Sequence, residues 1–150
     1  MNQKARQKLE IDARNSITRT SIRDVAVELQ SILTQRLVAY AAGLADGRDI
    51  GRYARGEREP QKDTVFNLKN LLFIVSILKS QESSETIQSW FMGMNPLLDD
   101  HSPAELLRAD PNNYSRVLDA ARDFVDTAEQ EEKIELAHVS KLNSPVSNEA

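Results

Sequence analysis

The sequence predicts an all-α protein, and three observations support this prediction. Apolar residues recur every three or four positions in several segments, which is the period of an amphipathic helix. Serine and threonine residues stand just before several of these segments, where their side chains can cap helices. No stretch of any length alternates apolar and polar residues as a strand would, and no internal repeat is present.

The N-terminal part is expected to begin with a polar arm over residues 1–20, at most a frayed helix. Ser21 followed by Asp24 resembles a capping box, so a helix should begin directly after Ser21. Its buried face is given by apolar residues at helical spacing, namely Ile22, Val25, Ala26, Leu29, Ile32 and Leu33.

Two shorter helices are expected before Pro60, with a tight turn between them. Thr34 can cap the first, TQRLVAYAAGL, and Gly43 opens the turn that follows it. The second covers residues 47–55, and Gly56 stands where helices often end in a left-handed turn.

Residues 62–79 are predicted to form a long helix with apolar residues on nearly every side. Such a helix must be buried on more than one side, as a spine joining two halves or as a dimer interface. A short helix should begin at Ser84 and end at Gly93, and another should begin at Ser102 and Pro103.

The last predicted helix starts near Asn112 and has apolar residues at Val117, Leu118 and Ala121. From Glu129 the chain turns acidic, so we expect an acidic tail whose end, KLNSPVSNEA, is flexible.

Charge is distributed unevenly along a chain whose overall net charge is −4. Residues 1–60 have a net charge of +3 and residues 61–150 a net charge of −7, so the two parts suit different partners. The chain has no cysteine and its polar N-terminus does not resemble a signal peptide, so we expect a cytoplasmic protein. No apolar run approaches the roughly 20 residues that span a membrane.

We expect no enzyme and no bound metal or cofactor. The two histidines, His101 and His138, lie in separate segments, and neither has metal-ligand spacing with another histidine or a carboxylate cluster. The five glycines punctuate helices and form no phosphate-binding loop, and serine nucleophile motifs are absent.

Four arginines gather in the segment DGRDIGRYARGEREP, although the chain as a whole is acidic. Wound as a helix, the segment places Arg48, Arg52 and Arg55 on one narrow face, with Ile50 and Tyr53 opposite. A short helix with a cationic outer face, held by apolar residues, is what a major groove accepts. A solvated surface helix with scattered arginines is the alternative interpretation.

The arrangement of Thr34, Gly43 and Ile50, followed by ARGEREP, resembles the Xre/Cro-type helix-turn-helix. The resemblance implies that helix 47–55 lies in the major groove of DNA. Arg48 and Arg52 are then the best candidates for reading base edges. Four residues are better placed for phosphate, namely Gln35, Arg36, Arg55 and Arg58.

Asp49 has two interpretations in that arrangement. Its carboxylate could accept a hydrogen bond from cytosine, or it could only pair with Arg48 or Arg52 and orient them. For Tyr53, packing in the core is favoured over a role at the surface.

The second half resembles the toxin-binding domain of the antitoxin Xre/MbcA/ParS family, and the resemblance covers about residues 25–126. Its marks are Trp90, Asn95, Pro96 and Leu97, then Ser102, Pro103, Leu106 and Leu107, then Val117, Leu118 and Ala121. In that family the domain directly follows an Xre-type helix-turn-helix. The family commonly has glycine near positions 99–100, where this chain has Asp99 and Asp100.

The resemblance implies a DNA-binding domain over residues 21–80 and a toxin-binding domain over residues 81–128. The N-terminal arm and the acidic tail over residues 129–150 are additions to the family pattern. The resemblance also implies a protein toxin of the RES-domain kind, which consumes NAD⁺, and an antitoxin C-terminal region that reaches toward the toxin's active site. The candidate partner-binding residues are Trp90, Asn95, Pro96, Leu97, Asp99 and Asp100.

Plainer interpretations stand beside these assignments. Trp90, Phe91 and Met94 are at helical spacing and suit a core, and Asp99 with Asp100 suits a solvated turn. The run EQEEKIE is typical of a wet helix face, although it could offer negative charge to a basic toxin cleft.

The favoured function is therefore a DNA-binding antitoxin that neutralises a toxin and represses its own operon. One alternative is a stand-alone repressor, for example of phage type, that uses its C-terminal domain to dimerise. Another is an interaction protein whose helix-turn-helix no longer binds DNA. Operator readers usually need two half-sites, so a homodimer is expected, through helix 62–79 or the Trp90 region.

Overall fold

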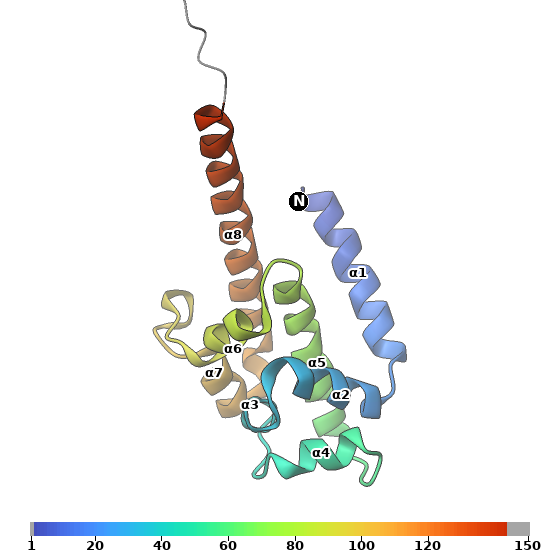
Figure 1. The fold of residues 1–150 in the computed structure, drawn as a ribbon. Helices are drawn as coiled ribbons and strands as arrows, with labels where there is room; N and C mark the ends of the chain where they lie inside the picture. The colour runs from blue at the N-terminus through green and yellow to red at the C-terminus, as the bar shows by residue number, and fades with distance from the viewer. Residues whose placement is uncertain (1, 144–150) are drawn as a thin grey trace, which may run out of the picture.

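The computed structural model describes residues 2–143, which form eight α-helices, two 3-10 helices and no strand (Figure 1). The predicted all-α fold is thereby confirmed. The α-helices are α1 (Gln3–Arg19), α2 (Ile22–Leu33), α3 (Gln35–Ala41), α4 (Arg48–Ala54), α5 (Lys62–Lys79), α6 (Ser84–Met92), α7 (Pro103–Ala109) and α8 (Tyr114–Leu142). The 3-10 helices are η1 (Pro96–Leu98) and η2 (Pro111–Asn113).

The cap residues set the helix boundaries as the sequence predicts. The hydroxyl of Ser21 accepts a hydrogen bond from the amide of Asp24, and that of Ser102 accepts one from the amide of Glu105, both at 3.1 Å. Gly56 adopts a φ of +71°, the left-handed conformation expected after α4.

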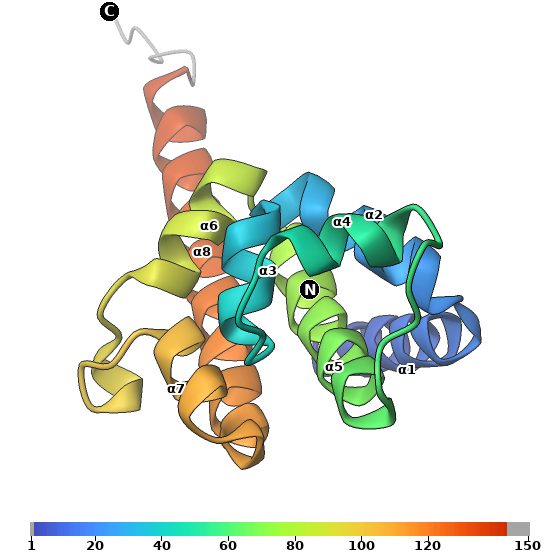
Figure 2. The ribbon, with the colours of Figure 1, turned by 90° about the horizontal axis from the view of Figure 1, so that it is seen from below.

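The long helix α5 is the spine of the molecule. It packs against α1, α2, α6 and α8, and Figure 2 shows it passing through the middle of the bundle. Its buried side chains run from Leu68 to Leu78, so the interpretation as a spine is confirmed. The interpretation of residues 62–79 as a dimer interface stays a prediction that can hold beside the first, since Phe66, near the N-terminal end of α5, is exposed.

The predicted polar arm is a docked helix of 17 residues. Arg14 of α1 stacks its guanidinium over the ring of Phe73 and donates a hydrogen bond to the Tyr114 hydroxyl at 2.8 Å. Ile17 is the buried residue of α1. Because polar and charged side chains hold most of this helix, its apolar pattern is too weak to predict the docking.

One hydrophobic core runs through both predicted domains. α2 packs against α6, and α3 packs against α7. The amide of Gln88 donates to the backbone oxygen of Ile32 at 2.7 Å, and Arg108 donates to the backbone oxygens of Tyr40 and Leu44. The two parts are therefore joined by apolar and polar contacts.

The predicted start of the tail, Glu129, lies inside a helix. This helix, α8, is 29 residues long in all and ends at Leu142. Figure 1 shows that its last turns project away from the other helices. The acidic segment is thus helical as far as Leu142, which agrees with the interpretation of EQEEKIE as an exposed helix face. Of the end predicted to be flexible, residues 144–150 lie outside the described part of the chain.

Candidate functional site

Helix α4 lies against α2 and α3, at the opposite end of the molecule from the tip of α8 (Figures 1 and 2). Ile50, Tyr53 and Ala54 are buried, as the helical wheel predicts, and Tyr53 is a core residue. Gly47 allows the close approach of α3, because a Cβ at this position would lie 3.3 Å from Cα of Arg36.

All four arginines of this region point outward, which agrees with the prediction. The side chain of Arg48 is 80% exposed, Arg55 and Arg58 are also exposed, and Arg52 is partly so. We call these four residues, with Gln35 and Arg36, the arginine face.

Arg48, Arg52, Arg55 and Arg58 each pair with a carboxylate of the same chain. Arg48 pairs with Asp46 at 2.8 Å, and Arg55 pairs with Glu57 at 2.8 Å. These partners stand two residues away along the chain. The hydrogen bond from the Arg48 side chain, more than any other cause, lowers the pKa of Asp46 from 3.8 to about 2. The Arg55 side chain likewise lowers the pKa of Glu57.

Asp49 orients two arginines at once. Its Oδ1 accepts a hydrogen bond from Arg52 at 2.7 Å and from Arg58 at 3.1 Å, and its side chain is only 17% exposed. The pairing with Arg52 agrees with the interpretation of Asp49 as an orienting residue. The partner of Arg48 is Asp46 instead.

Gln35, at the start of α3, reaches over α4. A Cβ on Gly51 would lie 2.8 Å from Nε2 of Gln35 and 3.1 Å from Nη1 of Arg55, so both side chains cover this glycine. Gln35 also donates to the side-chain oxygen of Gln30 at 2.9 Å. The fold thus brings the amide of Gln35 beside the arginines of α4, as the sequence predicts.

Sequence reasoning missed Arg23 in the first turn of α2. A Cβ on Gly56 would lie 3.5 Å from Nη1 of Arg23, so this cation borders the end of α4. Its position two residues after the cap residue Ser21 was a usable signal, since first turns of helices often meet anions through their free amides.

The second candidate region is the loop between α6 and α7. Its backbone is closed by Asn95, whose amide donates to the oxygen of His101 and whose oxygen accepts from Leu98 and Asp100. The Asn95 side chain also accepts from the amide of Leu97 at 3.0 Å. Asn95 is therefore the residue that shapes the loop.

Asp99 and Asp100 both adopt left-handed backbone conformations, with φ of +55° and +64°. The family that this region resembles commonly has glycine near these positions, and glycine is the residue that this conformation favours. Aspartate tolerates it better than most other residues. Asp99 forms an ion pair with Arg116 of α8 at 3.1 Å, which connects the loop to α8.

The burial of Trp90 agrees with its interpretation as a core residue and disagrees with its assignment as a partner contact, whereas Met94, also assigned to the core, is exposed. Trp90 is only 8% exposed, with its ring edge-on to Phe91 and tilted against Phe124. It belongs to the core because α6 turns this side toward α8. Exposed apolar surface comes instead from Met92, which sequence reasoning missed, Met94 and Leu97.

We call Met92, Met94 and Leu97 the apolar knuckle. Met94 is 82% exposed, and Pro96, Asp99 and Asp100 lie beside it on the same exposed loop. Leu98 is the residue that fixes the loop to the core. The knuckle therefore offers apolar contact next to two carboxylates.

Within residues 2–143, no three histidine, cysteine or acidic side chains gather closely enough to hold a metal ion. No helix in the same residues combines the length and apolar character needed to cross a membrane.

Comparisons of the chain with models of protein families, with curated proteins and with solved structures found no match.

Proposed function

We propose that the chain is a DNA-binding antitoxin, which contacts operator DNA through the arginine face and a toxin through the apolar knuckle. The observation that supports this most is the arginine face itself. Arg48 and Arg52 of α4 lie on one outward surface with Arg55 and Arg58, which follow this helix, and with the amide of Gln35 from α3. The other side of α4 is buried. Guanidinium and amide groups are the ones that read guanine and adenine in a major groove.

The carboxylates beside the arginines bear on how such a face works. Asp46, Asp49 and Glu57 hold the guanidinium groups in defined positions before DNA arrives. On binding, these ion pairs must be exchanged for phosphate or base contacts, which reduces the net gain. The arrangement favours modest affinity with good discrimination over tight, sequence-independent binding.

The apolar knuckle supports the second half of the proposal. Three large exposed apolar side chains close together are unusual on a surface that has no partner. The carboxylates of Asp99 and Asp100 next to them suit a partner whose contact surface is apolar at the centre and basic at the edge. A toxin of the RES-domain kind is the partner that the sequence resemblance implies.

The direct test is co-purification from the native cell of the full chain, tagged at its N-terminus, after nuclease treatment. The proposal expects one small protein at stoichiometric level that is toxic when expressed alone. A chain that purifies without a partner, yet binds the DNA upstream of its own gene, would instead be a stand-alone repressor.

A surface variant links the partner to the knuckle. Leu97→Glu is expected to weaken toxin binding by at least about tenfold, because one buried interface side chain contributes about 1–2 kcal/mol. Val27→Glu, which alters an exposed apolar residue on α2, is the matched control and should bind normally. Isothermal calorimetry with the purified toxin makes the comparison, and equal affinities for both variants would remove the knuckle from the interface.

A further inference from the structure

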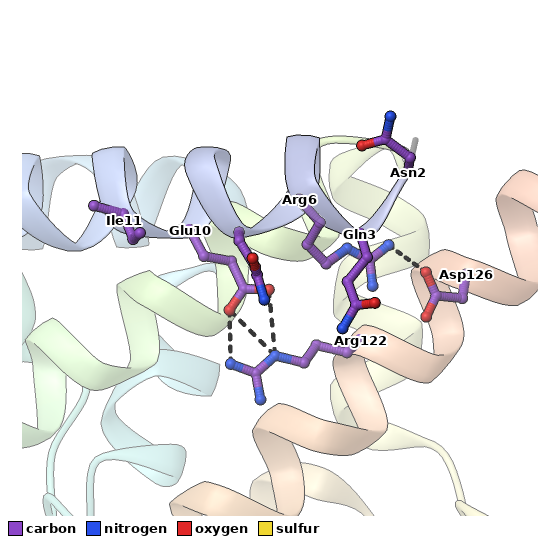
Figure 3. A pocket seen from close by; sticks show the side chains of 8 residues that line it. Asn2, Gln3, Arg6, Glu10, Ile11, Arg122 and Asp126 are labelled. Atoms are coloured by element: carbon purple, nitrogen blue, oxygen red, sulfur yellow. Dashed lines mark hydrogen bonds and ion pairs between the residues drawn. The ribbon is translucent and has the colours of Figure 1, made fainter.

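The first half of α1 and the middle of α8 diverge and leave an open cleft of about 750 Å³ (Figure 3). Its floor is the ion pair between Arg122 and Glu10, whose atoms approach to 2.6 Å, and a second pair joins Arg6 to Asp126. Ile11, on the wall formed by α1, is 60% exposed. The cleft thus has a polar floor and an apolar side chain on its rim.

Among residues 2–143, no other element covers the last turns of α8. Every residue from 130 to 142 is exposed, including four large apolar ones, Ile134, Leu136, Val139 and Leu142. We call residues 129–142 the α8 extension. An isolated helix of this length is marginal in water, so its apolar residues need contacts from elsewhere to hold it.

Leu136 and Val139 continue the buried face of α8. At 100° per residue they fall within roughly 60° of Val125, which is in the core, whereas Ile134 falls on the opposite side. Glu132 lies on the same face, between Val125 and Leu136. Two copies of this face packed together would bring carboxylates against one another, so the face suits a basic helix instead.

The basic helix that suits it is the start of α1. Residues 2–11 carry Lys4, Arg6 and Lys8 against Glu10, a net charge of +2. Residues 129–142 carry four glutamates against Lys133 and Lys141, a net charge of −2. The N-terminal end of α1, which lines the cleft, and the C-terminal end of α8 lie at the same end of the molecule (Figure 1).

We propose that the chain forms a two-fold dimer in which the α8 extension of each copy seats in the α1–α8 cleft of the other. The copies face each other with the ends that carry the extension, so the extensions run antiparallel. Contacts are reciprocal, as a closed two-fold interface requires. In this dimer the two arginine faces lie at the two outer ends, so each can contact a separate DNA segment. The proposed dimer does not depend on the proposed function.

The first test is sedimentation equilibrium of the full chain with variants of the extension. The proposal expects a dimer at micromolar concentration, and Leu136→Asp with Val139→Asp should raise its dissociation constant by at least about tenfold. Ile134→Asp is the matched control, since Ile134 is 62% exposed and Leu136 61%. Helical content by circular dichroism shows whether each variant is folded.

A charge exchange identifies the two surfaces that meet. One variant carries Lys4→Glu and Lys8→Glu, and the other carries Glu131→Lys, Glu132→Lys and Glu135→Lys. The proposal expects each to be mainly monomeric alone and the two to form a heterodimer when mixed, because only the mixture pairs opposite charges at both contacts. Dimers of the α1 variant alone would show that α1 is not the partner surface and would overturn the proposal.

Two further outcomes would also overturn it. A full chain that stays monomeric at micromolar concentration has no such interface. A Leu142→Cys variant that oxidises readily to a linked dimer would place the two helix tips side by side, which an antiparallel arrangement excludes. The natural chain has no cysteine, so any disulfide-linked dimer must join the two introduced cysteines.

Discussion

Asp46 and Arg48 show how a single ion pair defines part of the arginine face. The pKa of Asp46 falls to about 2 because the Arg48 side chain donates to its carboxylate, so this carboxylate stays ionised where a free aspartate is largely protonated. A lowered folded-state pKa means that the pair favours folding above pH 3.8 and loses this contribution as the pH falls toward 2.

We therefore expect the carboxyl carbon of Asp46 to titrate near pH 2 in a nuclear magnetic resonance pH series, and to move toward 3.8 in Arg48→Gln. Arg116→Gln, which removes an exposed arginine from another surface, is the control and should leave the Asp46 titration unchanged. A wild-type midpoint close to 3.8 would mean that the pair does not persist in solution.

Asp100 adopts a left-handed conformation that costs an L-residue about 1 kcal/mol relative to glycine. Asp100→Gly should therefore raise the free energy of unfolding by up to about 0.5 kcal/mol in urea denaturation, after the extra entropy of glycine in the unfolded chain is counted. Asp100→Ala removes the same carboxylate without relieving the backbone and should not stabilise. Equal effects of the two substitutions would assign the change to charge instead of conformation.

At the scale of one element, α4 has a glycine at its N-cap, Gly47, and another at its centre, Gly51, with opposite surroundings. A Cβ on Gly51 meets only the ends of the Gln35 and Arg55 side chains, which can move aside. A Cβ on Gly47 meets the backbone of Arg36, which cannot. Gly51→Ala should leave stability unchanged or raise it by up to about 1 kcal/mol through helix propensity, whereas Gly47→Ala should lower it. Thermal unfolding of both variants measures the difference.

The Gly51→Ala variant also distinguishes an effect on DNA binding from an effect on stability. Gly51→Ala should weaken DNA binding without loss of stability, because the added methyl group displaces Gln35 and Arg55 from the arginine face. If Gly51→Ala binds DNA as tightly as the wild type, the amide of Gln35 has no part in the contact.

Local signals decided which elements the sequence could predict. The helix over residues 62–79 was predicted with the bounds that α5 has, since its apolar residues are dense and Pro60 precedes it. The docking of α1 was missed because Arg14 on Phe73 and Glu10 on Arg122 replace the apolar contacts that a pattern reveals. The α8 extension was read as a tail from its charge, although Glu, Lys, Ala and Leu all favour helix.

At the scale of the whole molecule, the outward direction of the arginines was predictable because it depends on residues within two turns of one helix. The burial of Trp90 was also predictable from its helical spacing, but its contact with Phe124 was not, because the two residues are 34 positions apart and only the tertiary fold brings their rings together. The carboxylate partners of the arginines also escaped prediction in part, since Asp46 and Glu57 lie outside the helix.

The central claim, that the arginine face contacts DNA, is tested most directly by fluorescence anisotropy on the DNA upstream of the gene, over a range of salt concentrations. About 4–6 phosphate contacts predict a slope of log affinity against log salt of roughly −4 to −5. Arg52→Ala should cost about 1–3 kcal/mol of binding, and Arg116→Ala, an exposed arginine that also pairs with an aspartate, should cost nothing measurable. Binding that ignores salt, or equal losses in both variants, would contradict the account.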